Sequence, residues 1–240
     1  MNPKFSIITV CYNSVKTIER TIASVLFQTY QNFEYIIIDG LSTDGTVELI
    51  DKYKKKYSDK IHVVSEKDKG IYDAMNKGIE IATGDLIGII NSDDYYEVDA
   101  LEIVARAFDN EKYEIIYGML RTIKDGKEVS VYLKNHQWLD KDMITHPTCF
   151  ITKKIYEDFG LYSLRYRYSA DYEFMLRISK KPVIVFKPVY HIIANFTLDG
   201  ASASIKAYID TLNLKKEYGL INKRKYWFEI IKSQVALKIK

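Results

Sequence analysis

The chain has 240 residues, 47% of them apolar, which is enough for the packed core of one large α/β domain or two small ones. A net charge of +3 is too small to indicate a nucleic-acid-binding protein, so we expect no nucleic-acid partner. Cys11 and Cys149 are the two cysteines, and they support neither a disulfide framework nor a cysteine zinc site. The sequence shows no secretory signal and no run long enough to span a bilayer, which favours a cytoplasmic protein.

The first hundred residues alternate short β-rich apolar runs with amphipathic segments. Strands are expected over 5–10, 33–39, 61–65 and 86–90. Asn13 or Ser14 is expected to cap the first helix. The segment "STDGT" from Ser42 is expected to cap a helix around 47–53. Helical faces are formed by Ile18, Ile22, Val25 and Leu26, by Tyr72, Met75, Ile79 and Ala82, and by Leu101, Val104, Ala105 and Phe108. This half is typical of repeated βα units.

The second half has a different pattern. Asp125-Gly126 is a hairpin turn signal between two β-rich runs, 119–123 and 129–133, so we expect a small antiparallel insertion. A helix is expected from Ser169 or Asp171 through Lys180, followed by a final short strand at 182–186. No Pro/Gly/Ser-rich linker separates the halves, which predicts a single domain over 1–240.

Polar side chains gather where the predicted strands of the first half end. Tyr12 and Asn13 follow the first strand, Asp39 ends the second, and Glu66 and Asp68 follow the third. The fourth runs into "NSDD", residues 91–94. Because the carboxyl ends of parallel strands share one edge of a sheet, these groups should meet and could hold a base, a ribose and a metal-bound diphosphate.

The alternative is that these residues only form turns and helix caps, which is the more common role of any one of them taken alone. Asp44 and Asp99 are best explained in that way. Asp93 and Asp94 are not, since two adjacent carboxylates repel and a divalent cation relieves that cost. The sequence lacks G-x-G-x-x-G and G-x-x-x-x-G-K-[ST] motifs, so a bound diphosphate would need a metal ion to offset its charge.

Five segments, in order from Phe5 to Arg177, resemble one known family. They read "FSIITVCYNS", "IIIDGLSTDGT", "DKGIYDAMNKGI", "GDLIGIINSDD" and "SADYEFMLR". With them the sequence resembles the inverting family 2 glycosyltransferases with the GT-A fold, and within these the members that elongate polysaccharides or glycolipids. The resemblance implies a central, mostly parallel sheet flanked by helices. It also implies a nucleotide-diphosphate sugar as donor, with a UDP-sugar favoured, and a saccharide or lipid-linked acceptor.

The resemblance also assigns roles to individual residues. It implies that 1–100 bind the nucleotide and 101–204 the acceptor, with a nucleotide site formed by Thr9, Tyr12, Asn13, Asp39, Asp68, Asp73, Asn76, Lys77 and Ser92. Tyr12 would stack on the base and Asp39 would accept a hydrogen bond from a uracil-type N–H. Asn91-Ser92-Asp93 matches the family's D-x-D motif, so Asp93 would bind Mn²⁺ or Mg²⁺. Asp171 falls at the position of the family's catalytic base, and Asp94 and His146 would lie on the acceptor side.

The sequence departs from the common family pattern at several of these positions. Asn91 stands where Asp is usual, Gly40 replaces the second acid of a D-D-G form, Met75 replaces Arg and Ala170 replaces Glu. The C-terminal metal-binding His of many members has no clear match, because His191 lies several residues too early and Asp199 is nearer that place.

One base with in-line attack would invert the anomeric centre, and we find no second, nucleophilic carboxylate for a retaining route. Asp171 could also serve as the N-cap of its helix, and Glu173 is expected at the surface or behind the site.

Two rival functions remain. One is a relative that binds sugar nucleotides without transferring them, which Asn91 and the missing His favour. The other is a nucleotidyltransferase, whose glycine-rich basic signature "VCYNSVKT" lacks.

Residues 205–240 form a basic tail with nine Lys or Arg and three acids. Within 223–240, basic residues are mixed with aromatic and aliphatic ones, and we expect a basic helix with an apolar face. Such a helix could lie on an anionic membrane, at the inner face of the cytoplasmic membrane, or pack on the domain with its lysines in solvent.

Overall fold

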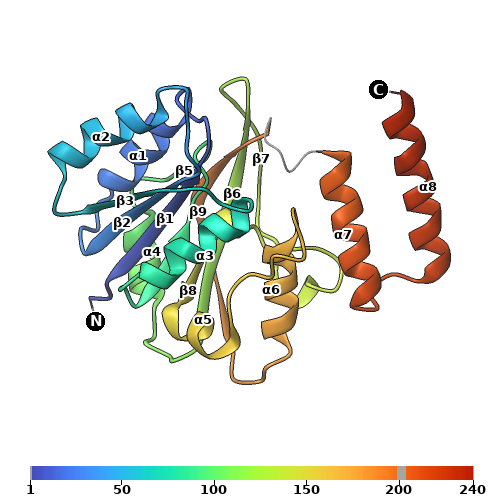
Figure 1. Ribbon diagram of the computed structural model, residues 1–240. Helices are drawn as coiled ribbons and strands as arrows, with labels where there is room; N and C mark the ends of the chain where they lie inside the picture. The colour runs from blue at the N-terminus through green and yellow to red at the C-terminus, as the bar shows by residue number, and fades with distance from the viewer. Residues whose placement is uncertain (1, 199–203, 240) are drawn as a thin grey trace.

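A sheet of nine strands runs through the residues described by this computed structural model, 2–198 and 204–239 (Figure 1). The strand order is β3-β2-β1-β4-β8-β6-β9-β5, and β7 pairs with β6 outside this row. Pairing is parallel among β1 to β4 and between β6 and β9, and antiparallel where β8, β5 and β7 join. The predicted α/β class, mostly parallel with a small antiparallel insertion, is confirmed.

The first half consists of alternating strands and helices, as predicted. Its elements are β1 (Phe5–Cys11), α1 (Ile18–Leu26), β2 (Phe33–Asp39), α2 (Thr46–Lys56), β3 (Ile61–Ser65), α3 (Ile71–Ile81) and β4 (Leu86–Ile89). All seven residues of β1 and of β2 are buried, because helices cover both faces of this part of the sheet. The helix cap expected at Asn13 or Ser14 is wrong: Thr17 is the N-cap residue of α1, and Asn13 has a left-handed φ of 50° in the preceding turn.

The second half contains shorter elements and one long strand pair. They are β5 (Tyr95–Tyr96), α4 (Ala100–Ala107), β6 (Glu114–Lys124), β7 (Lys127–Tyr132), the 3-10 turns η1 (His136–Trp138) and η2 (His146–Thr148), β8 (Cys149–Thr152), α5 (Lys153–Phe159), α6 (Ala170–Ser179) and β9 (Val185–Thr197). The hairpin at Asp125-Gly126 is confirmed, with φ of 50° and 74°. The strand expected at 182–186 is wrong in extent: β9 is 13 residues long, because it follows β6 past a register shift near Met119.

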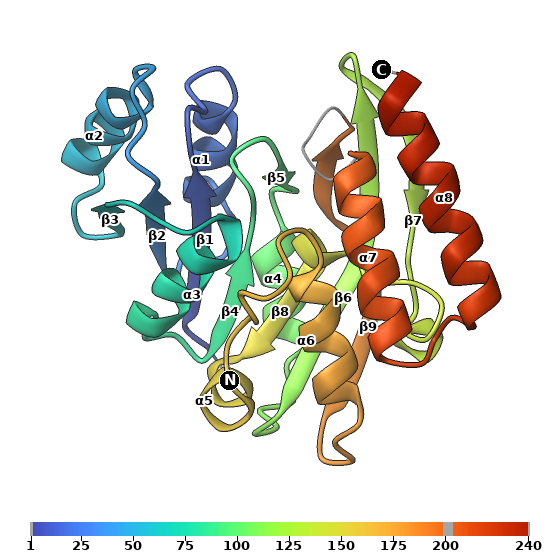
Figure 2. The same cartoon turned by 45° about the vertical axis from the view of Figure 1, so that its right-hand side comes forward.

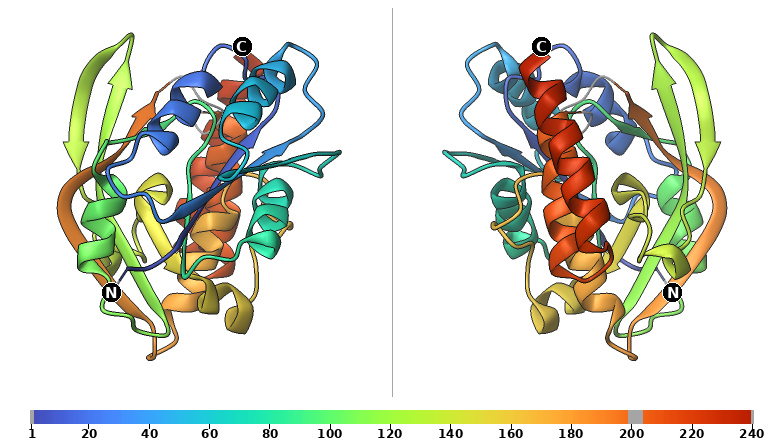
Figure 3. Two further views of the ribbon diagram at one scale, coloured as in Figure 1. Left: turned by 90° about the vertical axis from the view of Figure 1, so that its left-hand side faces the viewer. Right: turned by 90° about the vertical axis from the view of Figure 1, so that its right-hand side faces the viewer.

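Two apolar cores lie on opposite faces of the sheet. One contains the buried faces of α3, α5 and α6, with Met75, Ile79 and Phe174 among its members. The other contains those of α1, α2 and α4, including Ile22, Ile50 and Leu101. Figure 3 shows α3 and α4 on the two sides of the sheet. The three-layer arrangement leaves the strand ends as the places where side chains of β1 to β4 can reach solvent.

A buried carboxylate joins three segments at the amino edge of the sheet. Glu34 on β2 accepts hydrogen bonds from Ser6 Oγ at 2.5 Å and from Thr83 N and Oγ1 at 2.6 and 2.9 Å. Lys4 Nζ lies 3.3 Å from its second oxygen. Burial raises the pKa of Glu34, but the hydrogen bonds and the lysine outweigh burial, so the pKa is below its ordinary value.

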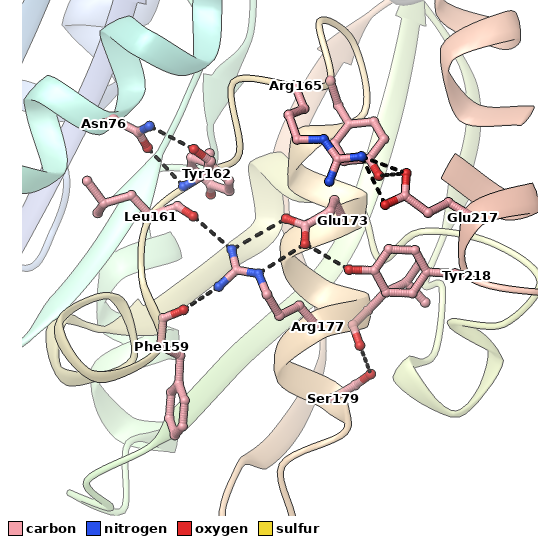
Figure 4. Close-up of polar contacts among 12 residues, drawn as sticks. Asn76, Phe159, Leu161, Tyr162, Arg165, Glu173, Arg177, Ser179, Glu217 and Tyr218 are labelled. Atoms are coloured by element: carbon pink, nitrogen blue, oxygen red, sulfur yellow. Dashed lines mark hydrogen bonds and ion pairs between the residues drawn. The ribbon is translucent and has the colours of Figure 1, made fainter. Parts of the chain in front are cut away.

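A polar cluster anchors α6 to its neighbours (Figure 4). Arg177 on α6 donates to the carbonyl oxygens of Phe159 and Leu161, which precede the helix, and pairs with Glu173 at 3.0 Å. Tyr218 donates to the same Glu173 carboxylate at 2.8 Å. Glu173 is therefore buried and structural, which fits the expectation that it lies behind the site. Since a buried charge is stable only when it is paired, this cluster holds the 159–161 segment and the C-terminal helices against α6.

The C-terminal tail forms two antiparallel helices, α7 (Ile205–Glu217) and α8 (Lys223–Ile239), beside α6 (Figures 1 and 2). Asp210 of α7 accepts from Tyr168 N and Ser169 Oγ, each at 2.8 Å, immediately before α6. Tyr226 and Ile230 of α8 pack on Leu212 of α7. No helix in the described part of the chain is both long and apolar enough to cross a membrane.

Replacing Glu34 by Gln should lower the free energy of unfolding at pH 7 by about 2 kcal/mol, because a buried carboxylate with charge-assisted hydrogen bonds is lost. The folded-state pKa is depressed, so this stabilisation is present above the ordinary value of 4.5 and is lost as the pH falls through the folded-state pKa. The stability difference between wild type and Glu34→Gln should therefore shrink in acid.

Urea unfolding followed by circular dichroism at pH 7 and at successively lower pH would measure this difference. Glu19→Gln is the control and should change stability little, because Glu19 is exposed and its carboxylate accepts, among the described residues, from Tyr53 alone. A wild-type to Glu34→Gln difference that stays constant with pH would contradict the assignment.

Candidate functional site

The carboxyl ends of β1 to β4 lie at one edge of the sheet, as the sequence predicts (Figure 2). Cys11, Asp39 and Ser65 are aligned across β1, β2 and β3 at that edge. Ile90, after β4, donates its N–H to Ile8, which brings the Asn91–Asp94 turn beside the end of β1. Residues from four separate segments therefore form one polar rim, which consists of Tyr12, Asn13, Asp39, Asp68 and the Asn91–Asp94 turn.

Asp39 is a fully buried member of this rim. Its oxygens accept from Ser42 N, from Ser42 Oγ, and from Ser65 Oγ at 2.7 Å. These bonds hold the turn after β2 against β3. Thr9 also has no exposed surface, and its Oγ1 accepts a hydrogen bond from Tyr35 OH at 3.0 Å. Both side chains therefore have their polar atoms bonded inside the protein in this structure, and their roles in nucleotide binding stay predictions.

Tyr12 and Asn13 form the exposed part of the rim. The Tyr12 side chain is 64% exposed and is free to stack on a ligand. Asn13 Oδ1 accepts from Thr43 N at 2.9 Å, which joins the turns after β1 and β2. Gly40 lies beneath them, and a Cβ at this position would come within 2.5 Å of a carboxylate oxygen of Asp68. An acidic side chain at position 40, which the family often has, would be repelled by the Asp68 carboxylate. Glycine at position 40 avoids this repulsion.

The segment between β3 and α3 contributes a half-buried carboxylate, Asp68, which accepts from Gly70 N at 2.8 Å. Lys77 Nζ pairs with Glu66 at 2.7 Å and lies 3.8 Å from Asp73, and its pKa is raised chiefly by the Glu66 hydrogen bond. Asp73 and Lys77 therefore sit beside Asp68, as the family pattern implies. Asn76 lies on another face of α3, where its amide bonds both the N–H and the C=O of Tyr162, at 3.0 and 2.9 Å (Figure 4).

The Asn91–Asp94 turn is held by α1 and β9. Arg20 Nη2 and Thr197 Oγ1 both donate to the Asp93 carbonyl at 2.8 Å, and Thr197 N donates to Asp94 Oδ1 at 2.9 Å. Ser92 Oγ lies 2.8 Å from Ser14 Oγ, so it too is bonded within the protein. Asp94 is fully buried and its carboxyl holds β9, so its expected place on the acceptor side stays a prediction.

Oxygen atoms of this turn fit a hard divalent cation. Asn91 Oδ1 and Asp94 Oδ2 are buried, and no described residue gives either a hydrogen bond. Burial raises the pKa of Asp93, and burial together with the Asp93 charge raises that of Asp94 well above its ordinary value. Mg²⁺ or Mn²⁺ would satisfy these oxygens and offset the repulsion of the two acids.

The described residues contain no group of three or more His, Cys, Asp or Glu arranged to hold a metal alone. Asn91, water and substrate phosphates would therefore have to complete the coordination, as is usual for Mg²⁺. Asp199, which the family pattern places near the missing His, lies outside the described residues.

Asp171 lies in the first turn of α6, one residue after its start, so it is not the N-cap residue, which is Ser169. Its Oδ1 accepts from Tyr72 OH at 2.7 Å and from Tyr172 N at 2.9 Å. No described residue donates to Oδ2, and the side chain is partly exposed. The carboxylate is thus held at one oxygen and available at the other, which suits a group that takes a proton from a ligand.

His146 is in the same region. Its Nε2 lies 3.0 Å from Tyr162 OH, and burial lowers the pKa of this histidine although the Asp171 charge opposes the change. A neutral His146 beside Asp171 is compatible with the expected acceptor side.

Sequence reasoning missed Arg20, Thr197 and Tyr72 as partners of the acids, since each appears in the sequence as an ordinary residue of a helix or strand face.

The chain is similar to known glycosyltransferases. A family model described as Glycosyl transferase family 2 matches residues 6–188. A "PGL/p-HBAD biosynthesis glycosyltransferase" of Mycobacterium tuberculosis is 28% identical over 91% of this chain and 87% of the relative. A "Chondroitin synthase" of Escherichia coli is 29% identical over 90% of this chain, which spans 31% of that longer relative.

Two solved structures share the fold. S. aureus TarS 1-349 in complex with UDP-GlcNAc has a TM-score of 0.71 at 19% identity, covering 88% of this chain and 65% of that one. The mannosyltransferase PcManGT from Pyrobaculum calidifontis, in complex with GDP-Man and Mn2+, has a TM-score of 0.71 at 16% identity, covering 93% and 66%. Since the family model covers most of the chain and the sheet has the matching topology, this protein belongs to glycosyl transferase family 2 and is a glycosyltransferase with the GT-A fold.

Proposed function

We propose that this enzyme transfers a sugar from a nucleotide-diphosphate donor, with a UDP-sugar favoured, to a hydroxyl of a saccharide or lipid-linked acceptor. The product would belong to a cell-surface polysaccharide or glycolipid, the classes of product that the relatives' names describe. One observation carries the proposal: Asp171 presents a carboxylate oxygen with no hydrogen bond from the described residues, in the region of the half-buried His146.

Residues 1–100 would bind the donor. Tyr12 is exposed and able to stack on the base, while Asn13 and Asp39 fix the turns around it. Asp68, with Asp73 and Lys77 beside it, would lie toward the ribose and diphosphate. The rim is rich in oxygen atoms and poor in cations, so it suits the hydroxyls of a ribose better than bare phosphates.

Asp93 would hold Mn²⁺ or Mg²⁺ in the same turn as Asn91 Oδ1 and Asp94 Oδ2, the two buried oxygens that no described residue bonds. When bound, the ion would offset the negative charge of the leaving diphosphate. An amide oxygen is a weaker ligand than a carboxylate, but Asn91 still supplies an oxygen of the kind that both ions accept. Replacement of the family's Asp by Asn91 therefore does not by itself argue for an inactive relative.

Residues 101–204 would bind the acceptor and hold the base. Asp171 Oδ2 would take the proton of the acceptor hydroxyl while that oxygen forms a bond to the anomeric carbon. The bond from the anomeric carbon to the diphosphate breaks, and its electron pair leaves with the nucleotide. Attack from the face opposite the leaving group inverts the anomeric centre.

We also propose that α8 brings the enzyme to the cytoplasmic face of an anionic membrane. One face of α8 packs on α7, and another exposes Trp227, Phe228, Ile231 and Val235 to solvent. Trp227, Ile231 and Val235 are spaced at i, i+4 and i+8, so they form a stripe along the helix. Lys223, Arg224 and Lys225 are exposed at its start. Figure 3 shows α8 as the outermost element on its side. An apolar stripe beside basic residues fits the interface of an anionic bilayer.

A nucleotide screen should identify the donor class. At about 100 times its dissociation constant, the matching nucleotide sugar with Mn²⁺ or Mg²⁺ should raise the melting temperature by roughly 5 to 10 °C. Asp93→Asn should remove the metal-dependent part of the shift, because the charged ligand is lost. Asp125→Asn, in the exposed β6–β7 turn, should retain it. Stabilisation by none of the UDP-, GDP- and dTDP-sugars would support a different ligand.

Asp171→Asn should reduce sugar transfer by roughly 100-fold to 10,000-fold, since the amide cannot accept the acceptor proton. Donor binding, measured by the same thermal shift, should be nearly unchanged. NMR of the wild-type product should show inversion at the anomeric carbon. Transfer at the wild-type rate by Asp171→Asn would rule out this base.

Neutralising Lys223, Arg224 and Lys225 should weaken binding to anionic vesicles about 100-fold, at about 1 kcal/mol for each charge. Flotation with phosphatidylserine-containing and with neutral vesicles measures the change. The matched control neutralises Lys54, Lys55 and Lys56, three exposed basic residues at the end of α2. Equal losses in the two triple variants, or no loss in either, would argue against a membrane contact through α8.

A further inference from the structure

We infer that Tyr72 is a positioning residue for catalysis: by donating its hydroxyl to Oδ1 of Asp171 at 2.7 Å, it fixes which carboxylate oxygen is presented to the acceptor. The inference rests on the proposed function, in which Asp171 is the general base. It gives a specific role to a residue that the helical pattern identifies only as part of an apolar face.

The two donors to Asp171 converge on a single oxygen. Tyr72 OH and the Tyr172 N–H both bond Oδ1, so a rotation of the carboxylate would break at least one of these bonds. Oδ2 receives no hydrogen bond from the described residues and is left for the substrate. Little free energy is then needed to orient this carboxylate when the acceptor binds, because its geometry is already set.

The Tyr72 hydroxyl is well suited to this task. Tyr72 is only 7% exposed, and its ring lies 5.6 Å from that of Tyr162. Burial, and then the negative charge of Asp171, raise the pKa of Tyr72 well above its ordinary value, so the phenol keeps its proton across neutral pH. A hydrogen bond from a neutral donor to a carboxylate is strong where water is excluded.

Tyr72 also connects the two halves of the protein. It is the second residue of α3, directly after the segment that contains Asp68, and Asp171 is on α6. One turn later on α3, Asn76 binds both backbone groups of Tyr162. The base of the acceptor half is therefore oriented by a helix of the donor half, and both contacts fix α3 against the chain that leads to α6.

Other titratable groups near Asp171 come from several elements, and they define the background of any pH measurement. They are His146 on η2, Cys149 on β8, Tyr162 before α6 and Asp210 on α7. Tyr72 differs from His146, Cys149 and Tyr162 in that it bonds the Asp171 carboxylate directly.

The test is Tyr72→Phe, which keeps the ring and removes only the hydroxyl. Its kcat should fall by roughly 10-fold to 100-fold, because the base is no longer held in one orientation. The KM for the donor should stay within about twofold, because no donor contact is removed.

Tyr156→Phe is the matched control. Tyr156 is equally buried and bonds Tyr162 OH at 3.2 Å, but it does not touch Asp171. This variant should keep kcat close to the wild-type value. If Tyr72→Phe proves unstable, 3,5-difluorotyrosine at position 72 retains the hydroxyl that orients Asp171 and should also keep kcat close to the wild-type value.

Wild-type kcat in folded Tyr72→Phe, or equal losses of kcat in Tyr72→Phe and Tyr156→Phe, would overturn the inference. A loss of kcat with the fluorinated tyrosine as large as the loss expected for Tyr72→Phe would do the same. The Asp171→Asn variant separates this failure from failure of the proposed function. If Asp171→Asn is inactive while Tyr72→Phe is normal, only the role of Tyr72 is refuted, whereas an active Asp171→Asn removes the base itself.

Discussion

Parallel pairing of β1 with β2 on one side and β4 on the other is the constraint on which the rest of the structure depends. Parallel strands need crossover helices, and these helices cover both faces of the sheet. Every side chain along β1 and β2 is consequently buried. Chemistry is then possible only beyond the strand ends, and the shared direction of the strands brings those ends to one edge.

The polar rim at this edge is built from turns that hold one another. Asn13 bonds the turn after β2, Asp39 bonds that turn and β3, and Ser92 bonds Ser14 after β1. Many of the polar side chains that follow the strands in the sequence therefore hold these turns together. What remains for a ligand is a smaller set: an exposed Tyr12, the partly exposed Asp68 and Asp93, and one oxygen each of Asn91 and Asp94 that no described residue bonds.

Asp171, the base that we propose, is supported differently, by contacts between elements that are distant in the sequence. Tyr72 of α3 bonds Asp171, Arg177 and Glu173 of α6 hold the preceding segment, and Asp210 of α7 bonds the start of α6. A general base must keep its oxygen within hydrogen-bond reach of the substrate, so supports on both sides of α6 are useful to it. The C-terminal helices thus contribute to the site as well as exposing the apolar stripe of α8.

The sequence by itself determined the βα repeats, the hairpin at Asp125-Gly126 and the edge at which the acids gather, because hydrophobic period and turn residues are local signals. The family resemblance, through its motifs, predicted Asp93 as a metal ligand and Asp171 as the base. Only the tertiary structure decided which of the predicted site residues are accessible: Thr9, Asp39 and Asp94 are buried, and Asn76 bonds Tyr162. It alone showed the length of β9, which depends on its pairing with β6, and the donors that Tyr72, Arg20 and Thr197 supply. These partners come from separate elements, so their contacts depend on how the layers pack and leave no pattern in a single stretch of sequence.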